Sequence, residues 1–398
     1  SLDLTSKCNG FNDPIASRSM YYIALTLYES LLPGLQNYQT LQVRLNGFNT
    51  TLPQADPSKK YNWLIVASYA LYQVATEMYK SSGSENLSRI KTLRDKFALQ
   101  ESVELDPETI TNSIELGNSI GWKMVDYSQT DGQSEAYLHN YPTYELPQKE
   151  GSWIPTPPDY FAKPLMPYWG NNRVCILDNL YVASVPNTLK YSTDKNSIMY
   201  AEAVEAYNIS TSLDTHQRDV LEYWNSSNDK HASPVCHNFL LMQQLIKEKQ
   251  LDLENACKLF LRLSIAHYDS YIITWKIKYA TMLLRPSTYI KQNIDRYYIP
   301  YLPSLPVPEY VSEKAVLYSA SSRIFSETFG YRYSFMDYTQ STRIDLRENK
   351  KYFDSFEEMA KEASYSDLYG AIQFRSSIDA GYQVGSEIAS NVLKVKLN

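Results

Sequence analysis

Apolar residues recur at intervals of three and four along most of the chain, the spacing of helices that pack one face against a core. Alternating apolar and polar runs, which would predict strands, are not found at any length. The helical spacing covers residues 14–32, 62–80, 84–102, 106–127, 198–209, 214–227, 235–248, 252–284, 311–329, 354–365 and 367–394. We therefore expect an all-α fold, one helical domain over 1–398 built as a bundle of about ten helices.

Three of these helices carry further information. Residues 62–80 are apolar on several faces, so this helix should be buried, and the more charged 84–102 should cover it. The helix over 106–127 opens with Asp106-Pro107-Glu108, an acidic N-cap followed by a proline in the first turn.

Two proline-rich segments, 128–172 and 286–310, interrupt the helical pattern. The first is also rich in aromatic residues, which argues against a disordered linker and predicts a long loop packed across the bundle to shape a pocket. Its aromatic residues are Trp153, Tyr160, Phe161, Tyr168 and Trp169. They either pack the loop onto the bundle, which we favour, or form a platform for a carbohydrate.

Composition narrows the function classes. The chain has 398 residues, of which 43% are hydrophobic and 21% charged, so it can bury a sizeable core. A net charge of −6 disfavours nucleic-acid binding. Only 13 Gly accompany 35 Tyr, and so few glycines argue against nucleotide-binding βαβ turns and propellers. No window is apolar enough for a membrane span.

The cysteines and histidines show no metal-binding or catalytic spacing. The cysteines are Cys8, Cys175, Cys236 and Cys257, and no two form a CxxC pair. The histidines are His139, His216, His231, His237 and His267, without an HExxH motif. We therefore expect no metal site, and we interpret His267 as a core residue. GxSxG, GxxxxGK[ST] and GxGxxG motifs are also absent from the sequence.

Lys278 and Arg285 form the first candidate site. They are seven residues apart in a helical pattern that Pro286 ends, so two helical turns should place them on one face. Two cations among Tyr, Met and Leu are costly unless an anion lies between them. The functional interpretation is an oxyanion clamp, and the alternative is a pair of surface cations that extend to solvent.

The segment KYATMLLRP (278–286) resembles the K-x6-R-P motif of the vanadium-dependent haloperoxidase and type 2 phosphatidic acid phosphatase superfamily. Other segments resemble its bacterial haloperoxidase-like branch in the same order, over about residues 11–390. They are FNDPIASRSMYYIALTLYE near the start, GSWIPTPPDYFAKPLMPYWGNNR (151–173), LEYWNSSNDKHASPVCHNF (221–239) and DLYGAIQFRSSIDAGYQVG (367–385).

The resemblance implies an all-α fold and a site for phosphate or vanadate. The family holds this anion with a Lys, two Arg, the Ser and Gly of a P-S-G-H motif, and two His. In phosphatases one His attacks phosphorus and the other protonates the leaving group. In haloperoxidases the first of these binds vanadium, and peroxide is activated on the metal.

The match to this site is partial. Lys278, Arg285 and Ser312 match the family, and they remain as the remnant of an anion site. Glu313 stands at the Gly position of P-S-G-H and Lys314 at the position of the acid–base His.

The last motif departs further. Asp367 stands where the second Arg is expected, and Gln373 where the nucleophilic or metal-ligating His is expected. Trp153, Tyr310 and Gly370 would also belong to the pocket by this resemblance.

These replacements oppose the family's chemistry. A Gln amide forms no phosphoramidate and is a poor vanadium ligand, and a Lys is protonated near neutral pH. Lys278, Arg285 and Lys314 should instead pair with Glu313 and Asp367 as an internal salt-bridge network. Arg375, Arg323, His237 and His267 are not at motif positions and are not expected to restore the site.

Three hypotheses follow. The first is an inactive or altered member of the family, kept for binding a small-molecule or protein ligand, without a cofactor. The second is an active phosphatase or haloperoxidase with compensating residues, which would use phosphate or vanadate. The third is a glycan-binding protein of a bacterial envelope. We expect a periplasmic or lipid-anchored protein whose signal has been removed and that has no nucleic-acid partner. The sequence leaves a homodimer open as its oligomeric state.

Overall fold

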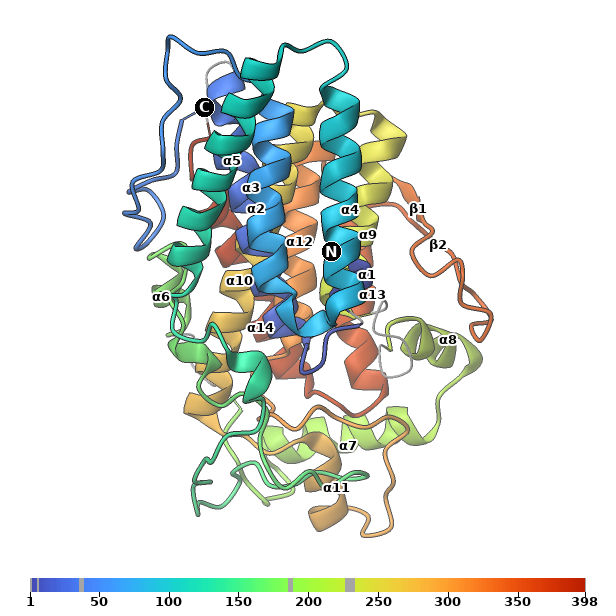
Figure 1. The fold of residues 1–398 in the computed structure, drawn as a ribbon. Coiled ribbons are helices and arrows are strands. Elements are labelled where there is room, and N and C mark those ends of the chain that lie inside the picture. The colour runs from blue at the N-terminus through green and yellow to red at the C-terminus, as the bar shows by residue number, and fades with distance from the viewer. Residues whose placement is uncertain (1, 6, 36–38, 185–188, 226–232, 398) are drawn as a thin grey trace.

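The computed structural model describes residues 2–5, 7–35, 39–184, 189–225 and 233–397, and it is mainly helical (Figure 1). In this part of the chain the α-helices are α1 (Leu2–Thr5), α2 (Asp13–Leu31), α3 (Trp63–Met78), α4 (Ser84–Glu101), α5 (Pro107–Ser128), α6 (Asn179–Val182), α7 (Ile198–Thr211), α8 (Thr215–Tyr223), α9 (Pro234–Lys249), α10 (Leu253–Thr281), α11 (Pro286–Asn293), α12 (Glu313–Phe329), α13 (Phe356–Tyr369) and α14 (Arg375–Leu393). The predicted all-α bundle is confirmed. The sequence pattern did not predict helices α1, α6 and α11, because helices this short contain too few residues to show a clear periodicity.

One short sheet accompanies the helices. Strands β1 (Phe335–Asp337) and β2 (Lys351–Phe353) pair antiparallel, with Phe335 opposite Phe353. Both aromatic side chains are buried, so this ribbon adds to the core beside α13. Three-residue strands are too short to show an alternating pattern in the sequence.

Helix α10 is the centre of the bundle and packs against α2, α12 and α14. Figure 1 shows α2, α3, α5, α10 and α12 side by side along the long direction of the molecule. Helix α4 contacts the outer side of α3 and has no buried residue among those described, as its charged sequence predicted.

Helices α7 and α11 contact each other at one end of the bundle, the lower end in Figure 1. The predicted loop over 128–172 reaches this end, and its two tryptophans, Trp153 and Trp169, are buried at 1% and 0% exposure. Tyr160, Phe161 and Tyr168 are exposed. The loop therefore packs through its tryptophans and presents its other aromatic rings outward.

The segment 286–310 differs from the loop that was predicted. It begins with α11, because Pro286 occupies the first helical turn, where its missing N–H costs nothing and its fixed φ favours helix. Extended Arg285 is the residue before that turn.

Helix α10 ends earlier than the predicted 284. Met282 adopts a left-handed conformation with φ 52°, and Leu283 then pairs with Ser152 in an isolated β-bridge. Lys278 and Arg285 therefore do not lie on one helix face, and the predicted two-turn spacing is wrong. Instead, the turn after Thr281 brings the side chains of Lys278 and Arg285 to the same carboxylate, that of Glu313.

The boundary between the last two helices is also shifted. The sequence pattern predicts helices over 354–365 and 367–394, whereas α13 continues to Tyr369 and α14 begins at Arg375. Asp367 consequently lies in the last turn of α13. Gln373 lies in the connection, where Ala371 has a φ of 51°.

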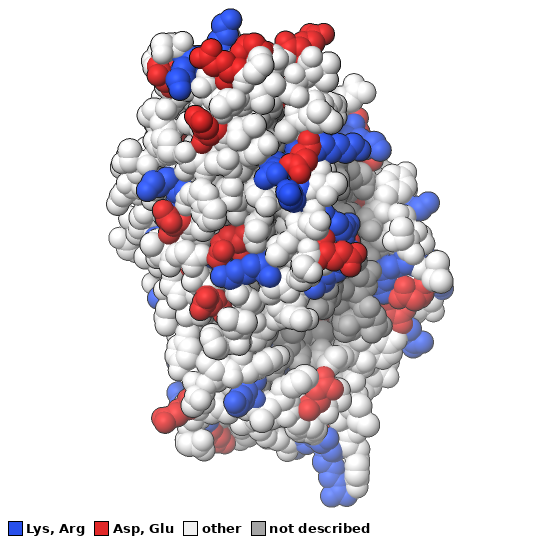
Figure 2. All heavy atoms as spheres, in the orientation of Figure 1, with Lys and Arg blue, Asp and Glu red and all other residues white. Residues whose placement is uncertain are grey.

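The surface carries both signs of charge. On the face in Figure 2, Lys and Arg side chains are interspersed with Asp and Glu. Within the described residues, no helix combines the length and the apolar character that a membrane crossing requires. The four cysteines are buried.

Candidate functional site

A cavity of about 680 Å³ with charged groups in its lining lies where α2, α10, α12 and α13 meet the loops around residues 141–165 and 302–306. Its aromatic lining residues are Phe11, Tyr141, Phe161, Trp224, Tyr271 and Trp275. Its charged lining residues are Asp13, Asp159, Glu313, Lys314 and Asp367. The volume and the mixture of apolar walls with a few polar groups are typical of small-molecule sites.

Glu313 and Lys278 form an ion pair at this cavity. The Glu313 Oε2 lies 2.8 Å from the Lys278 Nζ, and the lysine is completely buried. The same ammonium donates to the carbonyl oxygens of Pro308 at 3.0 Å and Glu309 at 2.8 Å. Burial lowers the pKa of Lys278 to about 8, although the Glu313 charge opposes this shift. All three ammonium protons thus have partners.

Arg285 lies on the other side of the same carboxylate. Its Nε donates to the Val307 carbonyl at 2.9 Å and its Nη1 to the Ile372 carbonyl at 3.2 Å. Its Nη2 is 4.0 Å from the Glu313 Oε1 and has no hydrogen-bond partner among the described residues. Burial favours protonated Glu313, but Lys278 and Arg285 outweigh it and lower the Glu313 pKa to about 2.

Lys314 and Asp367 form a second ion pair, with 2.6 Å between Nζ and Oδ1. The lysine side chain is 12% exposed and the aspartate 4%. Lys314 also donates to the Ser366 Oγ at 3.1 Å and the Trp224 carbonyl at 3.3 Å. Burial raises the pKa of Asp367, with Lys314 acting against it and Glu313 adding to it.

Gln373 completes the cluster from the α13–α14 connection. Its Nε2 donates to the Glu313 Oε2 at 3.1 Å, and its side chain is fully buried. Its Oε1 has no hydrogen-bond partner in the part of the chain described. Five of the motif residues from the sequence are therefore joined in two ion pairs and one amide contact around Glu313, namely Lys278, Glu313, Lys314, Asp367 and Gln373.

The remaining predicted pocket residues are buried beside this cluster but are not among the described residues that line the cavity. Ser312 caps α12, where its Oγ accepts from the Ala315 N–H at 3.2 Å. Trp153 and Tyr310 are buried at 1% and 0% exposure. Gly370 ends α13, and a Cβ there would lie 3.1 Å from the Ile372 side chain.

The other candidates lie elsewhere. His267 is buried against the Ser321 Oγ at 2.8 Å, and burial lowers its pKa to about 3. His237 contacts the Asp337 Oδ2 at 2.7 Å, and Arg375 pairs with Glu205 at 2.5 Å. His231 lies outside the described residues. Among those that are described, no His or Cys lines the cavity.

The sequence analysis missed two carboxyl groups, the partly buried Asp13 and the fully buried Glu309. Asp13, the first residue of α2, lines the cavity, and Tyr271 donates to its Oδ2 at 3.1 Å. Glu309 accepts from the Phe374 N–H at 2.7 Å and the Ser377 Oγ at 2.6 Å, and burial raises its pKa to about 7. Asp13 resembles an ordinary first-turn acid in the sequence, whereas Glu309 lies three residues before Ser312 of the candidate motif and could have been singled out.

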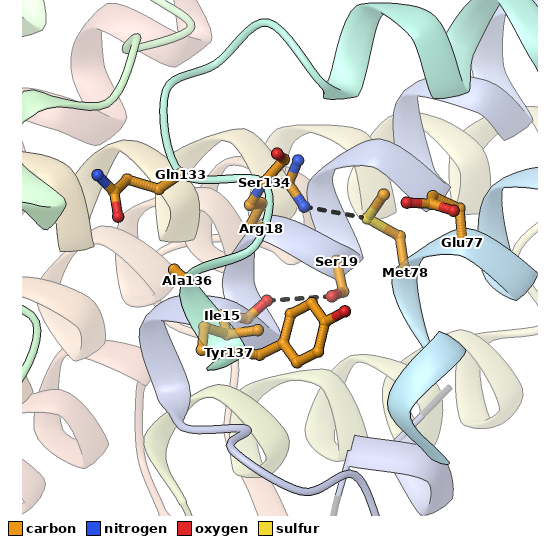
Figure 3. A pocket seen from close by; sticks show the side chains of 9 residues that line it. All are labelled: Ile15, Arg18, Ser19, Glu77, Met78, Gln133, Ser134, Ala136 and Tyr137. Carbon is orange, nitrogen blue, oxygen red and sulfur yellow. Dashed lines mark hydrogen bonds between the residues drawn. The ribbon is translucent and has the colours of Figure 1, made fainter. Parts of the chain in front are cut away.

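A second cavity, between α2, α3 and the loop before α6, is excluded as a site (Figure 3). Its volume is about 10 Å³, enough for no more than one water. Figure 3 shows Arg18 of α2 contacting the Met78 sulfur of α3, and Ser19 donating to the Ile15 carbonyl within α2, so both are structural contacts.

Comparison with known proteins places this geometry in context. The model of the second helical-bundle domain of vanadium chloroperoxidase (VCPO) matches residues 258–397, which include all of the motif residues above except Trp153. No curated protein matches the chain significantly.

Solved structures match over nearly the whole chain. A bacterial vanadium-dependent iodoperoxidase superposes with a TM-score of 0.87 at 26% identity, covering 100% of this chain and 95% of that one. The holo form of a bacterial vanadium-dependent chloroperoxidase gives 0.74 at 14% identity, covering 98% and 92%. An apo form gives 0.70 at 14% identity, covering 96% and 93%, and both chloroperoxidase likenesses concern the fold alone.

Proposed function

Because this chain belongs to the vanadium haloperoxidase-like superfamily, we propose that it is a member whose oxyanion site has been converted into an ion-paired structural cluster, and that it acts by binding a ligand. The observation that carries this proposal is the Glu313 carboxylate, 2.8 Å from Lys278 and 4.0 Å from Arg285. A bound phosphate or vanadate would need these two cations.

Charge opposes an oxyanion here. Glu313, with a pKa of about 2, is ionised at any physiological pH. At an effective dielectric constant of about 20, two like charges about 4 Å apart repel by about 4 kcal/mol, roughly a thousandfold in affinity. Vanadate or phosphate would have to displace a carboxylate that is already in place, so the residues present do not fit either anion.

The groups that would perform chemistry are also unsuited to it. Lys314 donates all its protons to Asp367, Ser366 and Trp224, which leaves it unable to exchange protons with a substrate. Gln373 supplies an amide where the family supplies an imidazole, and an amide is neither a nucleophile nor a good metal ligand. We therefore propose no catalytic step at this site.

Orthovanadate tests the proposal, since it mimics phosphate and is the cofactor of the peroxidases. Isothermal titration of orthovanadate into the protein at pH 7 should give no saturable heat. Hydrolysis of p-nitrophenyl phosphate, and bromide or iodide oxidation by peroxide with vanadate added, should match the protein-free rate. Micromolar vanadate binding, about −8 kcal/mol, would contradict the proposal and favour the active-enzyme hypothesis.

The location of the protein is a separate proposal. A periplasmic or lipid-anchored position in a bacterial envelope predicts that antibodies detect the native protein in the envelope fraction of its host. Recovery with cytoplasmic markers would contradict it.

A further inference from the structure

The cavity presents more negative than positive groups. Asp13, Glu313 and Asp367 line it at depth, and Lys314 is the one Lys or Arg among its described lining residues. Lys278 and Arg285 are completely buried and are not in this lining. Their charges act on Glu313, and Lys314 is held by Asp367. Among the described lining residues, this leaves two carboxylates without an ion-pair partner, namely Asp13, which is partly buried, and Asp159, which is exposed.

Asp13 has neutral partners. Tyr271 donates to it from α10, and Ser233 and the Val235 N–H hydrogen-bond it from the start of α9. No Lys, Arg or His in the described ranges lies within ion-pair distance of it, and the nearby Glu313 is repulsive. A partly buried carboxylate with hydrogen bonds but no cation gains most from a ligand that brings positive charge.

The walls of the cavity suit the same ligand. Trp224, Tyr271 and Trp275 line the cavity, and Phe11, Tyr141 and Phe161 add further aromatic side chains. Aromatic rings attract an ammonium group electrostatically, most strongly when water is excluded. An inorganic cation fits less well, because the described residues include no group of three or more His, Cys, Asp or Glu that could hold a metal ion.

An orphaned acceptor lies next to these groups. The Gln373 Oε1 is fully buried and accepts no hydrogen bond from the described residues, and the same side chain contacts Glu313. The Arg285 Nη2 is a donor in the same situation. Neither side chain is in the described lining of the cavity, so a buried water, and not a ligand, would satisfy these two atoms.

We propose that this cavity binds an organic cation, a protonated amine or quaternary ammonium compound, with Asp13 as its counter-ion and the aromatic walls around its charged head. The inference rests on the proposed function, since it names the ligand class for a cavity that no longer takes an oxyanion. The site has thus changed the sign of the charge it accepts.

Isothermal titration at pH 7.5 tests this with choline and with 3,3-dimethylbutan-1-ol, its neutral carbon isostere. Tetramethylammonium and phenethylammonium are titrated as two further cations. Their neutral counterparts are neopentyl alcohol and phenylpropyl alcohol, respectively. At least one cation should bind saturably and about ten-fold or more tighter than its neutral counterpart. Equal binding of cation and isostere, or no binding of any of the three cations, would overturn the proposal.

The matched variants are Asp13→Asn and Asp159→Asn. The first removes the partly buried charge and keeps the shape, and it should weaken cation binding about ten-fold or more. The second removes an exposed carboxylate at the same cavity and should change it less than about two-fold, since solvent screens that charge. Circular dichroism and melting curves verify that both variants fold, and equal losses in both would contradict the role of Asp13.

Vanadate titrated into the same sample separates the two proposals. If neither vanadate nor any of the cations binds, the organic-cation inference is wrong, but the proposed function is not contradicted. If vanadate binds, the proposed function itself is wrong, whether or not the cations bind.

Discussion

The Glu313 carboxylate accepts from the Lys278 ammonium at 2.8 Å, which joins the first residue of α12 to the last turn of α10. Glu313 is also a first-turn acid of α12, so the helix dipole stabilises its negative charge. The pair therefore links two central helices at the point where the family holds its anion.

Replacing Glu313 by Gly should show how much the burial of two uncompensated cations lowers the free energy of unfolding. Without a counter-charge for Lys278 and Arg285, the free energy of unfolding should fall by about 3–5 kcal/mol in phosphate-free buffer. Phosphate at 10 mM should restore part of this loss, because it binds the native state between the freed cations. Urea unfolding with and without phosphate measures both effects.

The control for that experiment is Glu357→Gly. Glu357 is likewise in a first helical turn, but its side chain is 60% exposed and pairs with Lys361. This variant should lose about 1 kcal/mol from helix propensity and show no phosphate dependence beyond that of the wild type. A phosphate-insensitive Glu313→Gly protein would argue that Lys278 and Arg285 no longer form an anion site.

The Lys314–Asp367 pair should behave as a unit. Lys314→Met leaves Asp367 as an uncompensated buried charge and should cost about 3–5 kcal/mol. Adding Asp367→Leu should recover most of that loss, because the buried charge is gone. Denaturant unfolding of the two single variants and the double variant measures the coupling energy.

A solvent-exposed pair provides the comparison. Arg375 and Glu205 have side-chain exposures of 42% and 33%, so Arg375→Ala should cost no more than about 1 kcal/mol. If Lys314→Met costs as little as Arg375→Ala, the buried pair is not a structural element.

Restoring four motif residues should restore oxyanion binding. In the variant Glu313→Gly, Lys314→His, Asp367→Arg and Gln373→His, two carboxylates and one ammonium are removed, and one guanidinium and two imidazoles are added. Orthovanadate should then bind at micromolar concentration or better by titration calorimetry. Failure of a correctly folded variant to bind it would show that residues beyond these positions abolished the site.

Organic-cation binding should weaken in acid. Burial raises the pKa of Asp13 to about 6, with Ser233, Tyr271 and the Val235 N–H acting against the shift and Glu313 adding to it. The other charged groups that line the cavity are Asp159, Glu313, Lys314 and Asp367. Above its pKa Asp13 is ionised and attracts the ligand, whereas below it the carboxyl is neutral.

Choline affinity should therefore fall about five- to ten-fold between pH 7.5 and pH 5, as Asp13 takes up its proton. Glu313 does not contribute to this change, since its pKa of about 2 leaves it ionised throughout. Asp13→Asn should show a shallower profile over the same range, in which Glu309, with a pKa of about 7, still titrates. Calorimetry at several pH values measures the affinity for choline. An equal pH dependence of this affinity in the variant would mean that a group other than Asp13 titrates.

Local sequence patterns predicted most of the helices because each depends on apolar spacing and end signals within about twenty residues. Asn62, Asp106 and Ser312 cap α3, α5 and α12 as their positions before apolar runs indicate. The end of α10 was missed because the left-handed Met282 carries no signal in its own sequence. The strands were missed because three residues show no period.

The motif positions could also be identified from the sequence, because the motifs occur along the chain in the same order as in the family. The replacements at Glu313 and Asp367 and their opposite charge to Lys278 and Lys314 could be seen without coordinates. Which acid pairs with which base could not, because that depends on the turn after Thr281 and on the length of α13.

The sequence by itself determined the all-α fold and the identity of the charges at the site, since both follow from residue types in chain order. Only the tertiary structure decided that Asp13, from α2, shares one cavity with Glu313 and Asp367, residues about 300 and 350 positions later. Burial, which sets the energy of each charge, is a property of the packed helices and of no segment alone.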